Sequence, residues 1–248
     1  MPERFFKERE PEWRPKERGP EKKRWEKERK EKEREREREK ARVVLYFFRH
    51  GKKEERKPGQ PDEEVLLTKE GRTQAYKKGL EMKPKKAAMA VGSPRKRTLE
   101  TALRILFAED FPPEVSYEEI QKKIQEELDK EYKLGPGRVK KFIIDPRLDF
   151  NTYDELTQAV KKKETIKFLF ESDELELLKK YKNENLTILS ITAGNVAEII
   201  KKYLKVGNVF KKIVEEKPGK YGNQLERYLG THHAINECFL IKVIEKVK

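Results

Sequence analysis

The sequence is short of the residues that make cross-links and metal sites. It contains one cysteine, Cys238, among 248 residues. A single cysteine excludes a disulfide bond within the chain and a metal site built from several thiolates. Because disulfides persist in oxidising compartments, their absence points to a reducing one, and we predict a cytoplasmic protein.

Long apolar segments are missing as well. No uncharged apolar run approaches the roughly 18 residues of a membrane-spanning helix. Charged side chains begin at Glu3, which leaves no room for the apolar core of a secretory signal. We therefore expect neither a membrane partner nor export.

Charge, in contrast, is abundant. Charged residues make up 43% of the chain and hydrophobic residues 35%, and the formal net charge is +14. A basic excess favours anionic partners such as phosphorylated molecules, nucleic acid or acidic lipid. The 46 acidic residues among 60 basic ones are equally typical of a soluble, charge-rich surface.

Most of the apolar deficit lies in residues 1–41, which we predict to be a charged arm outside a folded domain over residues 42–248. Residues 1–20 are rich in proline and charge, a composition typical of disorder. Residues 21–41 place Glu four residues from Lys or Arg, which supports a solvated single helix. Such an arm is either inert or binds an acidic partner such as RNA.

From residue 43 onward, short apolar runs alternate with helical patterns. The runs predicted as strands are residues 43–48, 87–91, 142–144 and 186–191. Helices are predicted from a Thr68 cap to Met82, from the Ser93-Pro94 pair onward, over residues 116–131, over roughly 153–162 behind a Thr152–Glu155 capping box, after residue 191 and at the C-terminus. The alternation predicts an α/β fold with a mainly parallel central sheet.

The reactive residues cluster where these elements meet. His50 follows the first strand in the tripeptide Arg49-His50-Gly51, and Arg97 lies just after the second strand, where a helix begins. His232 and His233 precede the last helix. Ligands of parallel sheets bind beyond the C-terminal ends of the strands. We therefore expect these side chains to share one pocket.

Such a pocket suits phosphoryl transfer. A phosphate monoester carries close to two negative charges, and arginines grip it through forked donors that lysine lacks. A neutral imidazole can attack phosphorus, and a second imidazole can donate to the phosphoryl oxygens as charge shifts. The residue types needed for a phosphohistidine reaction are present.

Four segments of the chain resemble the histidine phosphatase (phosphoglycerate mutase-like) superfamily. They are VVLYFFRHG at 43–51, LLTKEGRTQA at 66–75, GSPRKRTLETA at 92–102 and THHAINE at 231–237. The resemblance implies a three-layer fold in which helices flank the sheet. It also implies His50 as nucleophile, His232 as second catalytic histidine, and Arg49 and Arg97 as phosphate ligands. The substrate is then a small-molecule or protein phosphate monoester, and no metal or other cofactor takes part.

Three points of the resemblance stay open. His233 is the alternative to His232 as the second histidine. The position of the family's glutamate proton donor holds Phe150, which leaves the adjacent Asp149 as a substitute. If residues 186–191 were the family's last strand, Ala193 would stand where the second histidine belongs.

The leading functional hypothesis is a phosphatase that hydrolyses a phosphate monoester through phospho-His50. A phosphoglycerate-type mutase is the first alternative, although residues 52–60 lack the asparagine usual in mutases. The second alternative is a catalytically weak module that binds phosphate or a phosphoprotein, with a nucleic-acid-binding basic arm.

Overall fold

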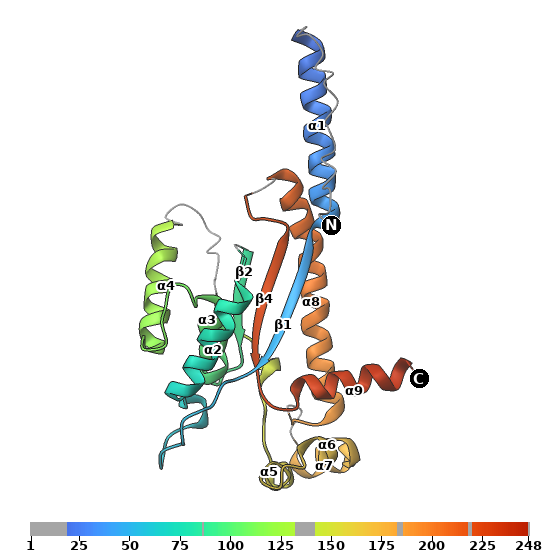
Figure 1. The fold of residues 1–248 in the computed structure, drawn as a ribbon. Helices are drawn as coiled ribbons and strands as arrows, with labels where there is room; N and C mark the ends of the chain where they lie inside the picture. Colours follow the sequence, from blue (N-terminus) through green and yellow to red (C-terminus); the bar gives the residue numbers. More distant parts are fainter. Residues whose placement is uncertain (1–18, 86, 132–141, 183–185, 218–219, 248) are drawn as a thin grey trace, which may run out of the picture.

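Four parallel strands form the centre of the protein. The computed structural model describes residues 19–85, 87–131, 142–182, 186–217 and 220–247. In these ranges β1 (Arg42–Arg49), β2 (Ala87–Gly92), β3 (Phe142–Ile144) and β4 (Gln224–Thr231) form one sheet in the order β1-β4-β2-β3. Every pairing in it is parallel (Figure 1). The predicted α/β fold with a parallel sheet is confirmed.

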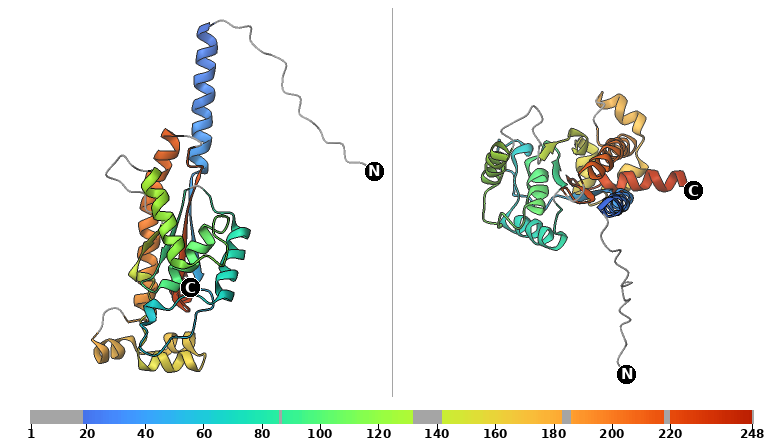
Figure 2. Two further views of the ribbon diagram at one scale, coloured as in Figure 1. Left: turned by 90° about the vertical axis from the view of Figure 1, so that its left-hand side faces the viewer. Right: turned by 90° about the horizontal axis from the view of Figure 1, so that it is seen from above.

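Helices cover both faces of this sheet and give the three expected layers. The helices in the described ranges are α1 (Gly19–Lys40), α2 (Lys69–Met82), α3 (Lys96–Leu106), α4 (Tyr117–Glu131), α5 (Asp154–Lys161), α6 (Thr165–Glu171), α7 (Glu174–Tyr181), α8 (Leu189–Glu216) and α9 (Ile235–Val247). Two short 3-10 turns, η1 (Asp62–Glu64) and η2 (Pro146–Leu148), lie in connections. The helices α2, α3 and α4 pack on one face and α8 on the other (Figures 1 and 2).

The strand β1 is apolar because both of its faces are covered. Tyr46 and Phe48 pack into the cluster beneath α2–α4, whereas Leu45 and Phe47 pack into the cluster beneath α8. Successive side chains of a strand point to opposite faces, so a strand buried on both sides has a continuous apolar sequence. The main-chain N–H of His50 then donates to the Thr231 carbonyl oxygen at 3.0 Å, which fixes residue 50 where the strands end.

The strand predicted over residues 186–191 is wrong. The helix α8 begins at Leu189, and buried residues follow along it at helical spacing, including Ala193, Val196 and Ile199. A short apolar run does not distinguish a strand from the start of a buried helix. Ala193 therefore lies inside a helix, and the alternative in which it replaces the second histidine is also wrong.

The strand that leads to His232 is β4, which lies between β1 and β2. Its sequence, QLERYLGT, contains charged residues that obscure a central strand. Glu226 is nonetheless buried, because its carboxylate accepts hydrogen bonds from the Lys85 N–H and the Tyr228 hydroxyl, each at 2.8 Å. Buried polar groups are tolerated when they are hydrogen-bonded in this way.

Three helix starts were predicted from cap residues. The helix predicted over roughly 153–162 is present as α5, but its N-cap is Tyr153 and no side chain caps it, so the capping box of Thr152 and Glu155 is wrong. Thr68 caps α2 as expected, and its hydroxyl accepts from the Gly71 N–H at 3.1 Å. The start at Ser93-Pro94 is wrong by a few residues, since α3 begins at Lys96. The Ser93 hydroxyl accepts from the Arg95 N–H at 3.2 Å and also contacts His232, so it supports the turn and the site instead of capping the helix.

The predicted helical arm is present as α1, which projects beyond one end of the sheet (Figure 1). Side chains 23–33 are exposed, as expected for a solvated helix. The disorder predicted for residues 1–20 falls almost entirely on residues 1–18, which lie outside the described residues. No helix in the described ranges is both long and apolar enough to span a bilayer.

A buried ion pair in α3 is expected to be a large contributor to stability. Glu100 and Arg104 have fully buried side chains, and the Arg104 Nε donates to Glu100 Oε1 at 2.9 Å. Glu100→Ala leaves the arginine charge uncompensated, so we expect the free energy of unfolding to fall by about 3–5 kcal/mol in urea denaturation. Glu81→Ala breaks an exposed pair with Lys78 and is expected to cost about 0.5 kcal/mol or less. Similar losses in the two variants would contradict this expectation.

Candidate active site

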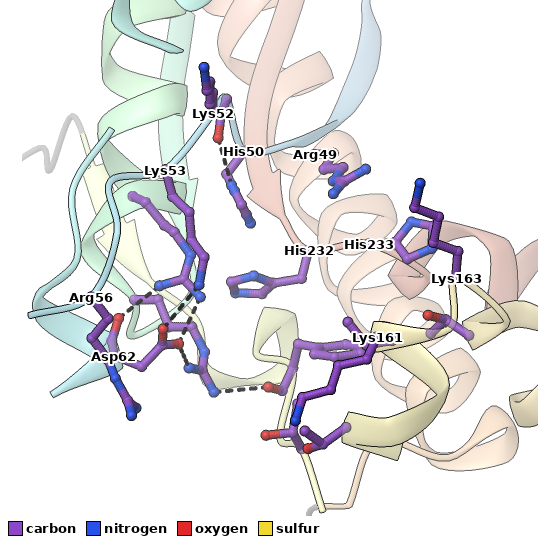
Figure 3. Close-up of a pocket in the computed structure, with 18 of the residues that line it drawn as sticks. Arg49, His50, Lys52, Lys53, Arg56, Asp62, Lys161, Lys163, His232 and His233 are labelled. Carbon is purple, nitrogen blue, oxygen red and sulfur yellow. Dashed lines mark hydrogen bonds and ion pairs between the residues drawn. The ribbon is translucent and has the colours of Figure 1, made fainter. Parts of the chain in front are cut away.

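A cavity of about 1140 Å³ opens where β1 and β4 end. The four predicted site residues, Arg49, His50, Arg97 and His232, all line it, and His233 does too. Figure 3 labels Arg49 and the three histidines. These residues come from segments up to 183 positions apart, since the parallel register aligns Arg49 with Thr231 at the same edge of the sheet. The structure therefore brings the predicted residues together.

His50 is held with one ring nitrogen free. Its Nδ1 lies 2.8 Å from the Gly51 carbonyl oxygen. A carbonyl oxygen only accepts, so Nδ1 carries the hydrogen and Nε2 keeps its lone pair. Burial lowers the pKa of His50 to about 4; the hydrogen bond to Gly51 opposes this shift, and the charge of Arg97 adds to it. The ring is therefore neutral near pH 7, as a nucleophile must be.

Glycine is required after this histidine because a helix comes close to the main chain. A Cβ built on Gly51 would lie 2.8 Å from the carbonyl oxygen of Gly71 in α2. A Cβ on Gly71 would lie 2.3 Å from the Lys52 carbonyl oxygen. The two glycines thus allow the start of α2 to pack directly against the segment that carries His50.

His232 stands beside His50. The centroids of the two rings are 5.3 Å apart at an interplanar angle of 67°, and the His232 Nε2 lies 2.9 Å from the Ser93 Oγ. The residue is 4% exposed. Burial lowers its pKa to about 2, with smaller contributions from His50 and Arg97. Of the two adjacent histidines, His232 is the one whose ring contacts that of His50.

Arg97 is already bound to a carboxylate. Its Nη1 donates to the main-chain oxygen of Asp62 at 2.7 Å, and its Nη2 donates to Asp62 Oδ2 at 2.8 Å. Arg95 and Lys53 also pair with Asp62. Burial raises the pKa of Asp62, but the hydrogen bond and charge of Arg97, with Arg95 and Lys53, outweigh it and hold that pKa well below its usual range.

Sequence reasoning missed Asp62, because it lies in a polar loop beside Glu63 and Glu64, with nothing to distinguish the three acids.

Arg49 lies where it was predicted, exposed and in the lining of the cavity. No hydrogen bond or ion pair of the Arg49 guanidinium occurs within the part of the chain that the structure describes. It is therefore available to an anion.

Asp149, the substitute for the family's proton donor, lies close to His232 but outside the lining of the cavity. Its Oδ1 accepts from Arg95 Nε at 2.7 Å and from the Phe150 N–H at 2.9 Å, and lies 3.6 Å from His232 Nε2. Phe150, at the glutamate position, lines the cavity, whereas Asp149 does not line it. Asp62 is the carboxylate that faces the cavity.

Acidification is expected to destabilise the fold through the paired histidines. The pKa is lowered to about 4 for His50 and about 2 for His232, below the roughly 6.5 of an unfolded histidine. The unfolded chain then binds protons that the native state excludes, so the free energy of unfolding falls as pH drops from about 6.5 toward 4. Urea unfolding at pH 7 and pH 5 measures this slope. A His50→Gln/His232→Gln variant should lose most of it, and an unchanged slope would contradict the assignment.

The fold and site together define an α/β protein in which a pair of imidazoles and several guanidinium groups line one cavity at the C-terminal ends of parallel strands. Residues 45–136 match the family model described as histidine phosphatase superfamily (branch 1), so the resemblance inferred from the motifs is confirmed over this segment. Searches of curated proteins and of solved structures gave no match.

The matched segment contains His50, Arg97 and the Gly51–Gly71 contact, whereas His232 lies beyond it. The four-stranded parallel sheet is consistent with a phosphoglycerate mutase-like fold. The superfamily includes phosphatases and mutases, so phosphoryl-transfer activity of this general kind is supported.

Proposed function

We propose that the protein is a phosphatase that hydrolyses a phosphate monoester through a phosphohistidine on His50. The observation that carries the proposal is the His50 imidazole, whose Nδ1 is held by the Gly51 carbonyl oxygen, next to His232 and Arg97 in one cavity. Few other reactions need an uncharged nitrogen nucleophile surrounded by arginines.

In the first step, His50 Nε2 attacks phosphorus and the bond from phosphorus to the alcohol oxygen breaks. Arg49 and Arg97 balance the charge on the phosphoryl oxygens, and His232 donates to one of them. The leaving oxygen takes a proton from solvent water and departs as the alcohol, and the water that attacks in the second step returns one proton to the solvent. In the second step, water attacks phospho-His50, which releases inorganic phosphate and restores the imidazole. Neither step requires a metal or a nucleotide.

The second candidate function is a module that binds phosphate without hydrolysing it. It is favoured by one observation: the carboxylates nearest the histidines, Asp62 and Asp149, are both held in ion pairs with Arg95. A paired carboxylate is a poor proton donor. An aryl phosphate needs little protonation of its leaving group, so it reports on the nucleophile alone.

The test is hydrolysis of para-nitrophenyl phosphate by the full chain in the presence of a metal chelator, with vanadate as inhibitor. The proposal predicts turnover that vanadate blocks competitively. Vanadate binding in calorimetry without any turnover would reject the phosphatase and favour the binding module. Transfer of the phosphoryl group to an added alcohol in preference to water would favour a mutase.

Asp62 is expected to compete with the substrate for Arg97. Asp62→Asn removes the negative charge, so the inhibition constant of inorganic phosphate should fall on the order of 3- to 10-fold. Steady-state inhibition against para-nitrophenyl phosphate measures it. The control is Glu64→Gln, which changes an exposed acid that pairs with Lys96 outside the cavity. Weaker phosphate binding in Asp62→Asn would show that Asp62 positions Arg97 instead of competing with phosphate.

A further inference from the structure

The cavity is far more basic than the rest of the chain. Among the residues that the structure describes, its lining includes eight cationic side chains but one carboxylate, that of Asp62, whereas the whole sequence has 60 basic and 46 acidic residues. The cationic residues are Arg49, Lys52, Lys53, Arg56, Arg95, Arg97, Lys161 and Lys163. A solvated surface of average composition would not produce this imbalance, so the cavity selects a highly anionic ligand.

Half of these cations already have partners. Lys52 pairs with Glu70, and Lys53, Arg95 and Arg97 pair with Asp62. For the other four, the described residues provide no ion pair; these are Arg49, Arg56, Lys161 and Lys163. The proposed phosphatase uses Arg49 and Arg97 for the phosphoryl group that is transferred. Arg56, Lys161 and Lys163 are thus additional positive charges with no assigned role, and the two lysines lie close together in sequence.

The turn after α5 directs two of three consecutive lysines to the cavity. The helix ends at Lys161, and Lys163 has a left-handed φ of 62°. The Lys163 N–H donates to the Val160 carbonyl oxygen at 3.1 Å, which closes the turn. Lys161 and Lys163 line the cavity, whereas Lys162, between them, does not.

A lysine at a helix C-terminus is favoured by the helix dipole. The dipole does not determine the direction of the lysine side chain, so it does not explain why these two side chains line the cavity. Figure 3 shows Lys161 and Lys163 on one side of the histidines, with Lys53, Arg56 and Asp62 on the other. The two lysines therefore form a separate cationic wall across the cavity from the Asp62–Arg97 contact.

The cavity also has room for more than one phosphate. Its volume of about 1140 Å³ exceeds the 300–1,000 Å³ usual for pockets that hold drug-sized ligands. Its polar residues outnumber apolar ones such as Phe150 and Val160. A molecule with several negative charges therefore matches the cationic side chains of this lining.

We propose that the substrate is a small molecule with a second phosphate group, and that Lys161 and Lys163 bind this group while the first is transferred to His50. The inference rests on the proposed phosphatase function and defines its substrate class. The lysines act on the part of the substrate that leaves, so they set specificity and take no part in bond breaking.

The experiment compares the bisphosphates of 1,3-propanediol to 1,6-hexanediol with the monophosphates of the same alcohols. The quantity measured is the ratio of kcat/KM for a bisphosphate to that for its matched monophosphate. We expect a ratio of about 10 or more in the wild-type protein at the best chain length. In Lys161→Gln/Lys163→Gln the ratio should fall toward one, while Lys162→Gln should keep the wild-type ratio.

A wild-type ratio near one, or a ratio that the double substitution leaves unchanged, would overturn the inference. So would faster hydrolysis of a singly phosphorylated peptide than of any bisphosphate. Calorimetry with His50→Ala separates this inference from the proposed function, because binding needs no turnover. Lysine-dependent preference for the bisphosphate without any hydrolysis by the wild type would reject the phosphatase and keep the second-phosphate site.

Discussion

Replacing His50 with alanine is expected to lower kcat for para-nitrophenyl phosphate by roughly 10⁴-fold or more, the scale seen when a covalent nucleophile is removed. Alanine leaves Arg49, Arg97 and His232 in place but offers no atom that can attack phosphorus. Water would have to attack directly, without the activation that the imidazole provides. Initial rates at saturating substrate, with highly purified protein, measure the effect.

The matched control for this variant is His233→Ala, which removes an imidazole from the same cavity without touching the ring pair of His50 and His232. It should retain activity within about tenfold of the wild type. Thermal unfolding of both variants checks that the fold persists. If His50→Ala were as active as His233→Ala, another residue would have to be the nucleophile.

Replacing Arg97 with lysine is expected to lower kcat/KM by about 10²- to 10³-fold. Lysine keeps the charge but loses the planar pair of donors that grips two oxygens of one phosphoryl group. In the present structure Nη1 and Nη2 of Arg97 both donate, to two oxygens of Asp62. That contact shows the geometry in which the fork would hold a phosphate.

The control for Arg97 is its neighbour Lys96, which begins α3 but does not line the cavity. Lys96→Gln removes a positive charge one residue away and should change kcat/KM less than about threefold. Equal losses in Arg97→Lys and Lys96→Gln would mean that overall charge, and not the forked contact, governs binding.

The sequence alone predicted the elements whose buried positions are apolar and whose ends carry a recognisable cap residue. The strand β1 has both faces covered and a continuous apolar sequence, and α2 begins at the cap residue that predicted it. The sequence did not predict elements in which charged or polar side chains are buried. The strand β4 is central yet carries Glu226 and Arg227, whose partners come from distant or unpredictable positions. The apolar run at 186–191 instead leads into α8.

The candidate site likewise contains residues that the sequence predicted and residues that it did not. His50, Arg97 and His232 were found because each stands beside an element boundary that the sequence reveals. Asp62 could not be found, since its contact with Arg97 spans 35 positions and depends on how the loop folds back. The orientation of Lys161 and Lys163 depends on a turn in which Lys163 itself has a left-handed φ. Because that position is not a glycine, the sequence does not indicate the turn.

The most direct measurement is identification of the phosphorylated atom during turnover. The protein is mixed rapidly with substrate and denatured in alkali, which preserves phosphohistidine, and then examined by peptide mass spectrometry and ³¹P NMR. Because Nδ1 of His50 is held by the Gly51 carbonyl oxygen, phosphate is predicted on Nε2 of His50. Turnover with the phosphate on another residue, or with no phosphorylated protein at any time point, would contradict the account.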